Sequence, residues 1–131
     1  MSDLFADRLL SAIAKKGSPI CVGIDPMYEM LPDAVLTSPR DADDAEAAID
    51  GIFKFTTEVL KIVAPHVPVV KFQSAYFEKY LWEGVEAYYS LVQEAKSLGL
   101  RKGYVHPLRS DLLPPGFHGY QVTRDGEVVD E

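Results

Sequence analysis

The sequence has few of the features that mark secreted, membrane-bound or nucleic-acid-binding proteins. A single cysteine, Cys21, excludes an internal disulfide framework and any metal site built from several cysteines. No apolar run approaches the roughly 20 residues of a membrane-spanning helix, and the N-terminus lacks the apolar core of a signal peptide. Basic residues are scarce, because 13 Lys and Arg stand against 20 Asp and Glu and leave a net charge of −7. This balance argues against general nucleic-acid binding and against an anionic membrane surface. Without a signal peptide or a membrane-spanning run, we expect a protein of the reducing cytoplasm.

The chain is also short in comparison with a complete α/β barrel. Its 131 residues suffice for one domain with a hydrophobic core, whereas a complete (β/α)₈ barrel needs about 250 residues. Hydrophobic residues make up 47% of the chain and charged residues 25%, as is ordinary for a globular protein. We therefore expect a single globular unit.

Two apolar runs each lead into one charged residue. Residues 20–26 (ICVGIDP) contain Asp25 and residues 67–73 (VPVVKFQ) contain Lys71. Such runs are typical of buried parallel strands, and a buried ammonium group without a partner is costly. The carboxyl ends of parallel strands meet at one rim, which is where α/β proteins bind their ligands. We therefore expect Asp25 and Lys71 to lie together at that rim.

Helical spacing of apolar residues occurs in three other segments. It predicts helices at about residues 3–16, 41–64 and 82–98, around strands at about 19–25 and 67–72. The alternation predicts adjacent parallel strands joined by crossovers, with the two later helices on one face of the sheet. A third strand should begin near residue 100, yet no apolar run follows there.

Three features have structural explanations that we favour over functional ones. Cys21 lies inside an apolar run, where a small buried hydrophobe is expected rather than a reactive thiol. Acidic residues at the start of the 41–64 helix complement its dipole, which explains them better than a metal site does. These acidic residues are Asp41, Asp43, Asp44 and Glu46. Six aromatic residues at helical spacing are expected to pack in the core rather than to stack nucleic-acid bases. They are Tyr76, Phe77, Tyr80, Trp82, Tyr88 and Tyr89.

Four motifs, in this order and spacing, resemble one enzyme family. They are residues 5–10 (FADRLL), 21–26 (CVGIDP), 70–78 (VKFQSAYFE) and 82–84 (WEG). Together they resemble the N-terminal part of orotidine 5′-phosphate decarboxylase of the longer bacterial type. The resemblance covers residues 4–100, about three quarters of the chain.

The resemblance implies a fold, a reaction and roles for two residues. The family is a (β/α)₈ TIM barrel that converts orotidine 5′-monophosphate to uridine 5′-monophosphate and CO₂ in pyrimidine biosynthesis, without a metal or an organic cofactor. By resemblance, Asp25 binds a ribose hydroxyl. Lys71 binds the ribose and a charged network at the rim, and it is the one catalytic candidate that the matched motifs supply. The implied partner is thus a small nucleotide, with no nucleic acid and no membrane.

The family's central motif does not occur in this sequence. The resemblance implies a D-x-K-x-x-D motif at the end of the third strand, where a carboxylate crowds the substrate carboxylate and a lysine protonates C6. No Asp-x-Lys is present between Leu100 and Glu131. We therefore expect a partial barrel of the first two βα units plus the N-terminal helix at residues 1–100, followed by an unrelated irregular tail at 101–131. The tail carries an Asp-Gly hairpin signal at 120–129, and its histidines lack the companions needed for a metal site.

Three functional interpretations remain open from the sequence. The chain is the ribose-contacting part of the decarboxylase, or a truncated remnant without catalysis and with weak nucleotide binding, or another barrel enzyme in which Lys71 forms a Schiff base. The third is opposed by Asp25, because an ion-pair partner favours the charged form of a lysine that must lose its proton to attack a carbonyl. In each case the open edges of a partial barrel favour self-association.

Overall fold

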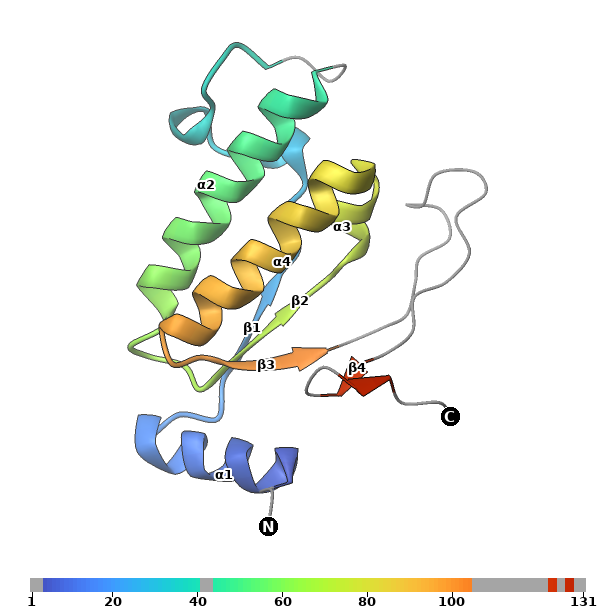
Figure 1. The fold of residues 1–131 in the computed structure, drawn as a ribbon. Coiled ribbons are helices and arrows are strands. Elements are labelled where there is room, and N and C mark those ends of the chain that lie inside the picture. Colours follow the sequence, from blue (N-terminus) through green and yellow to red (C-terminus); the bar gives the residue numbers. More distant parts are fainter. Residues whose placement is uncertain (1–3, 41–43, 105–122, 125–126, 129–131) are drawn as a thin grey trace.

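A computed structural model describes residues 4–40, 44–104, 123–124 and 127–128 of the chain (Figure 1). Helices and strands alternate through its main part, as the sequence predicts. The elements are α1 (Phe5–Lys16), β1 (Cys21–Ile24), the short 3₁₀ helices η1 (Tyr28–Met30) and η2 (Asp33–Val35), α2 (Ala45–Val63), β2 (Val69–Phe72), α3 (Ala75–Glu78), α4 (Leu81–Ser97), β3 (Arg101–Tyr104), β4 (Thr123–Arg124) and β5 (Glu127–Val128).

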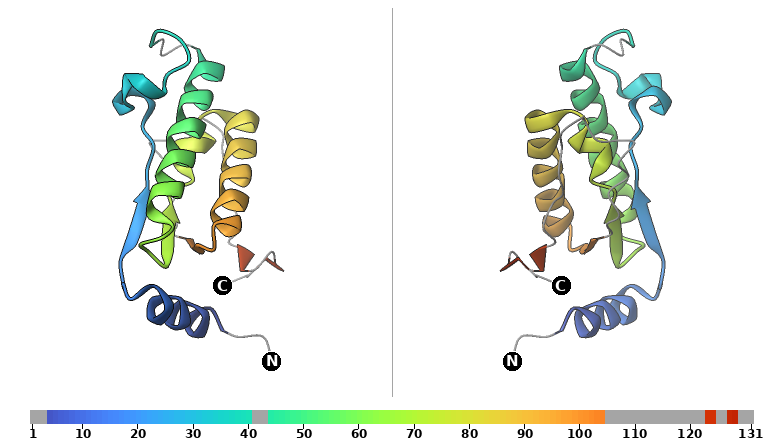
Figure 2. Two further views of the ribbon diagram at one scale, coloured as in Figure 1. Left: turned by 90° about the vertical axis from the view of Figure 1, so that its left-hand side faces the viewer. Right: turned by 90° about the vertical axis from the view of Figure 1, so that its right-hand side faces the viewer.

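The central element is a parallel sheet in the order β1-β2-β3. Val22 pairs with Val70 and Gly23 with Lys71, so the two predicted strands are adjacent, parallel and in register. The connections run through α2 and α4, which pack against each other on one face of the sheet (Figures 1 and 2). The predicted arrangement of these two strands and two helices is confirmed.

The third strand that the alternation of elements predicts near residue 100 is present, although the sequence has no apolar run there. β3 (Arg101–Tyr104) pairs in parallel with β2, and Gly103 stands opposite Lys71. Strand pairing uses backbone N–H and C=O groups, so a free edge can accept a segment without an apolar run. In the tail, β4 pairs antiparallel with β5 within the range of the predicted hairpin, while the rest of 105–131 lies outside the described residues. The division of the chain near residue 100 stays a prediction.

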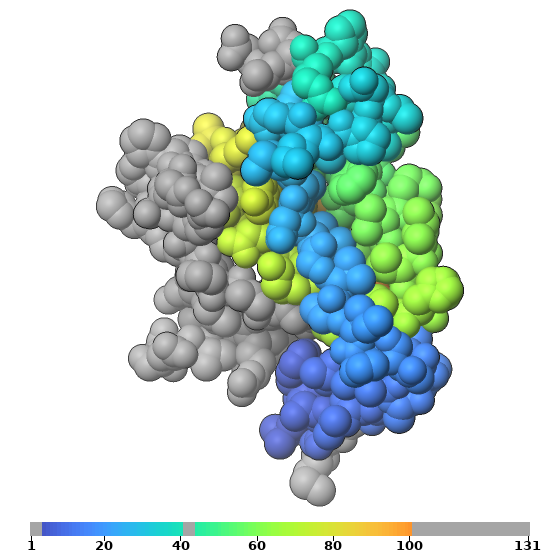
Figure 3. Space-filling model, turned by 180° about the vertical axis from the view of Figure 1, so that it is seen from behind, coloured from blue at the N-terminus to red at the C-terminus, as the bar shows by residue number. Residues whose placement is uncertain are grey.

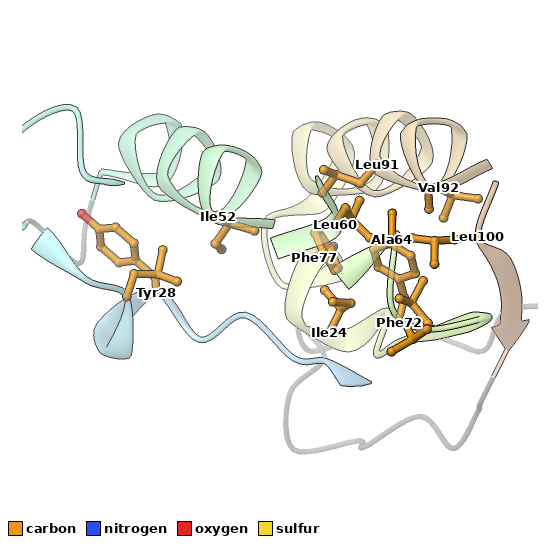
Figure 4. Packing of buried hydrophobic residues seen from close by; sticks show 14 of the residues in the cluster. Ile24, Tyr28, Ile52, Leu60, Ala64, Phe72, Phe77, Leu91, Val92 and Leu100 are labelled. Carbon is orange, nitrogen blue, oxygen red and sulfur yellow. The ribbon is translucent and has the colours of Figure 1, made fainter. Parts of the chain in front are cut away.

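The hydrophobic core lies between the sheet and the helix pair (Figure 4). Side chains alternate along a strand, so Val70 and Phe72 face the helices while Lys71 faces the opposite side. Burying one large apolar side chain contributes about 1.5–3 kcal/mol, which makes this cluster the main source of stability. Its members include Ile24, Tyr28, Leu31, Ile52, Leu60, Val70, Phe72, Phe77, Leu91 and Leu100.

The buried stripe of α2 is rotated slightly about the helix axis from the stripe that the spacing of apolar residues predicts, which is Ala45, Ile49, Ile52, Phe53, Thr56, Leu60 and Val63. Ile52, Thr56 and Leu60 are buried as expected, whereas Ala45 and Phe53 are exposed. Ala48 and Gly51 take part in the packing instead, because small residues allow close approach to neighbouring segments. Asp44 caps the helix by accepting a hydrogen bond from Ala47 N at 2.9 Å, in line with the predicted dipole role of the acidic cluster. Asp41 and Asp43 lie outside the described residues.

Two expectations about burial are wrong. Cys21 is exposed, because it belongs to the edge strand and faces away from α2 and α4. Trp82 and Tyr89 are also exposed, at 71% and 65%, and do not pack in the core. Phe77 and Tyr88 do pack there, with Tyr88 edge-on to Phe72 at 5.8 Å between ring centroids.

α1 lies beyond the N-terminal ends of the strands, apart from the helix pair (Figure 2). It ends at Gly17, which adopts the left-handed conformation expected of a residue just past a helix. None of its residues is fully buried. Lys16 Nζ donates a hydrogen bond to Ala64 O at 2.5 Å and so joins the end of α1 to the end of α2.

Candidate functional site at the carboxyl ends of the strands

Asp25 and Lys71 form an ion pair at the carboxyl ends of β1 and β2. Lys71 Nζ lies 3.4 Å from Asp25 Oδ1, which confirms that the two charges share one rim. A Cβ atom on Gly23 would lie 3.6 Å from Asp25 Oδ2 and 3.9 Å from Lys71 Nζ. The lysine side chain therefore extends over the neighbouring strand at a residue that has no side chain. The register partner Gly23 leaves the space in which the pair forms.

The pair is accessible to a ligand. The Lys71 side chain is 28% exposed and that of Asp25 is 45% exposed. Ion pairs with this much solvent contact contribute only about 0–1 kcal/mol to stability. The carboxylate can still accept hydrogen bonds from hydroxyl groups, and the ammonium group can still donate to oxygen atoms. Adjacent acceptor and donor groups of this kind suit the vicinal hydroxyl groups of a sugar.

A second ion pair joins the segments that follow the two strands. Lys79 Nζ, just after α3, lies 3.6 Å from Glu29 Oε1 in η1. The same ammonium group lies 4.9 Å from the centroid of the Tyr80 ring. Burial raises the pKa of the Tyr80 phenol above its ordinary value, although a hydrogen bond and the charge of Lys79 lower it. The sequence gives no signal for this pair, because neither residue stands at the end of an apolar run.

Two further findings concern only the part of the chain that the structure describes. No helix there is both long and apolar enough to cross a membrane. No group of three or more His, Cys, Asp or Glu side chains is arranged there to hold a metal ion.

Parallel strands with intervening helices and a charged pair at their carboxyl ends are the features of an α/β protein and agree with part of a (β/α)₈ barrel. A crystal structure from Streptomyces avermitilis, assigned as an orotidine 5′-phosphate decarboxylase, matches with a TM-score of 0.62 and 31% identity. The match covers 78% of this chain and 32% of the Streptomyces avermitilis chain. The predicted fold class, a partial TIM barrel, is thereby confirmed.

Curated orotidine 5′-phosphate decarboxylases show the same resemblance in sequence. The Caldicellulosiruptor saccharolyticus enzyme is 35% identical over 97 residues, which is 71% of this chain and 31% of the relative. The Nocardioides enzyme is 38% identical over 95 residues, or 72% of this chain and 31% of the relative. No model of a protein family matches. The predicted resemblance is confirmed, and the chain spans about a third of the length of the curated relatives that it matches.

Proposed function

We propose that this chain binds a ribonucleotide through Asp25 and Lys71, as the ribose-contacting part of an orotidine 5′-phosphate decarboxylase. The observation that carries the proposal is the half-exposed ion pair at 3.4 Å on the rim. The proposal is supported by the resemblance, because both residues lie in the motifs that carry it in this sequence and the chain is 35% identical to one decarboxylase over 97 residues. Asp25 accepts a hydrogen bond from a ribose hydroxyl, and Lys71 donates to the sugar oxygens. A cytoplasmic location is part of this proposal.

Calorimetric titration with uridine 5′-monophosphate tests the proposal. Hydrogen bonds to charged groups contribute about 1.5–3 kcal/mol, so Asp25→Asn and Lys71→Met should each weaken binding at least about tenfold. Lys61→Met is the matched control, because Lys61 forms an exposed pair with Glu58 at 3.3 Å on α2. This control should bind as the wild type does. Equal affinity of Lys71→Met and the wild type would refute the proposal.

A Schiff-base enzyme that uses Lys71 is the alternative to nucleotide binding. The Lys71 ammonium group is paired with Asp25 at 3.4 Å, whereas attack on a carbonyl requires a lysine amine that is free to approach the substrate. The geometry therefore favours the nucleotide site. Borohydride reduction in the presence of aldehyde or ketone substrates separates the two, since only a Schiff-base enzyme becomes covalently labelled at Lys71.

We also propose that the chain associates with copies of itself through the outer edge of β1. In the described residues β1 pairs with β2 on one side only, so its outer edge keeps unpaired backbone groups. Figure 3 shows the β1 segment and α1 at the surface of the molecule. Ile20, directly before β1, is 58% exposed and adds apolar surface beside this edge. The sedimentation coefficient should rise with concentration; one constant value for a monomer up to high concentration would contradict this.

A further inference from the structure

Arg40 connects three points of the long loop between β1 and α2. Its Nη2 donates to Leu31 O at 2.7 Å and to Asp33 Oδ1 at 2.9 Å. Its Nη1 donates to Tyr28 O. The guanidinium carbon also lies 5.5 Å from the centroid of the Tyr28 ring. One planar cation thus fixes both short helical turns of the loop.

The same loop is fixed to α2 through Tyr28. The Tyr28 side chain is only 1% exposed, and it lies beside Ile52 at the end of the core (Figure 4). A Cβ atom on Gly51 would lie 3.7 Å from the Tyr28 ring and 3.5 Å from Leu31 Cδ1. Tyr28 is therefore held by the helix on one side and by Arg40 on the other.

Asp25 lies between this fixed tyrosine and the end of the sheet. Ile24 O accepts a hydrogen bond from Gln73 N at 3.1 Å, which continues the β1–β2 pairing up to the residue before Asp25. Tyr28 follows three residues after Asp25, and Pro26 restricts the backbone of Asp25 itself. With both ends of so short a segment fixed, the backbone that carries the Asp25 carboxylate has little freedom to move.

We infer that Arg40 is a positioning residue for the Asp25 carboxylate at the nucleotide site. The inference rests on the proposed function of the Asp25–Lys71 pair. The two backbone carbonyls are the decisive partners of Arg40, because Asp33 is 93% exposed and an ion pair with so exposed a partner is weak. Arginine is required, since lysine offers a single point charge that cannot span both carbonyls.

The test compares two nucleotides in wild type, Arg40→Lys and Asp33→Asn. Uridine 5′-monophosphate has both ribose hydroxyls, and its 2′,3′-dideoxy analogue has neither. The dideoxy analogue cannot donate a hydrogen bond to the charged Asp25. The wild type should therefore bind uridine 5′-monophosphate about tenfold or more tightly than the analogue. Arg40→Lys should reduce this preference at least about threefold, since it keeps the charge but not the planar fork. Asp33→Asn should retain the preference.

The outcomes separate a positioning role from a merely structural one. If Arg40→Lys weakens binding of both nucleotides equally, or only lowers stability, the preference is unchanged and the inference is overturned. If the wild type binds neither nucleotide, the proposed function is refuted. The positioning role of Arg40 can then still be tested by NMR without a ligand. In that case the carboxyl ¹³C resonance of Asp25 should shift in Arg40→Lys and not in Asp33→Asn. An unshifted resonance in Arg40→Lys would overturn the inference.

Discussion

Gly84→Ala is expected to destabilise the protein by about 3 kcal/mol or more, because overpacking a tight contact commonly costs about 1–3 kcal/mol and this contact is closer than most. A Cβ atom on Gly84 would lie 1.9 Å from Phe77 O and 2.9 Å from Tyr80 Cβ. Phe77 O belongs to the backbone, so α3 and α4 must separate to accommodate the methyl group. The loss is large beside the total stability of a small domain, about 5–15 kcal/mol.

The corner between α3 and α4 has little capacity to relax. Leu81, the first residue of α4, has φ of 56°, a left-handed conformation that costs a non-glycine residue about 1–2 kcal/mol. The chain thus already adopts a strained backbone in order to bring Gly84 against Phe77. Urea denaturation of Gly84→Ala measures the loss, with Ser90→Ala on the exposed face of α4 as the control. If the free energies of unfolding of Gly84→Ala and Ser90→Ala differ by less than about 1 kcal/mol, which is about the size of an ordinary surface effect, the predicted clash at Gly84 is refuted.

The second large effect concerns catalysis. This chain alone should show no measurable decarboxylation of orotidine 5′-monophosphate. Asp25 and Lys71 would contact the sugar, whereas the rate depends on groups directed at the carboxylate and C6. Binding that stabilises the ground state and the transition state equally does not raise the chemical rate. Loss of one preorganised electrostatic group typically costs about 10²–10³ in rate, and the lysine and both carboxylates of the D-x-K-x-x-D motif are absent between Leu100 and Glu131.

The third strand does not place a substitute lysine beside Lys71. Lys102 stands at the register position of Val70, and Gly103 is the residue opposite Lys71. The assay follows the loss of orotidylate absorbance with purified chain, and Lys71→Ala serves as the control for contaminating enzyme. Turnover that persists through purification and disappears in Lys71→Ala would contradict the prediction.

The two strands and their charged pair could be predicted because their sequence signal is strong. An apolar run that leads into a single charge specifies both a buried strand and the end at which the charge lies, and Asp25 and Lys71 follow this pattern. For β3 only the position followed from the alternation of elements, since its residues pair through the backbone and form no apolar run that would predict a strand. The exposure of Cys21 could not be predicted either, because Cys21 shares its apolar pattern with residues that the helices cover.

The hydrogen bonds from Arg40 to its loop could not be predicted from the sequence. Its main partners, Tyr28 O and Leu31 O, are backbone carbonyls, and every residue except the chain end offers the same group. Such contacts depend on the path of the loop rather than on residue type. The close approach at Gly84 is similar, because a glycine inside a helix has several explanations and only the position of Phe77 O decides between them.

The most direct test of the central claim is an NMR titration of the ¹⁵N-labelled chain with uridine 5′-monophosphate. The account predicts that amide shifts concentrate at the carboxyl ends of β1 and β2, on Gly23 to Asp25 and on Lys71 to Gln73. In Asp25→Asn these shifts should need at least about tenfold more nucleotide, because a hydrogen bond to a charged group is lost. Shifts confined to α1 or α2, or equal titration curves for Asp25→Asn and the wild type, would contradict a nucleotide site at this rim.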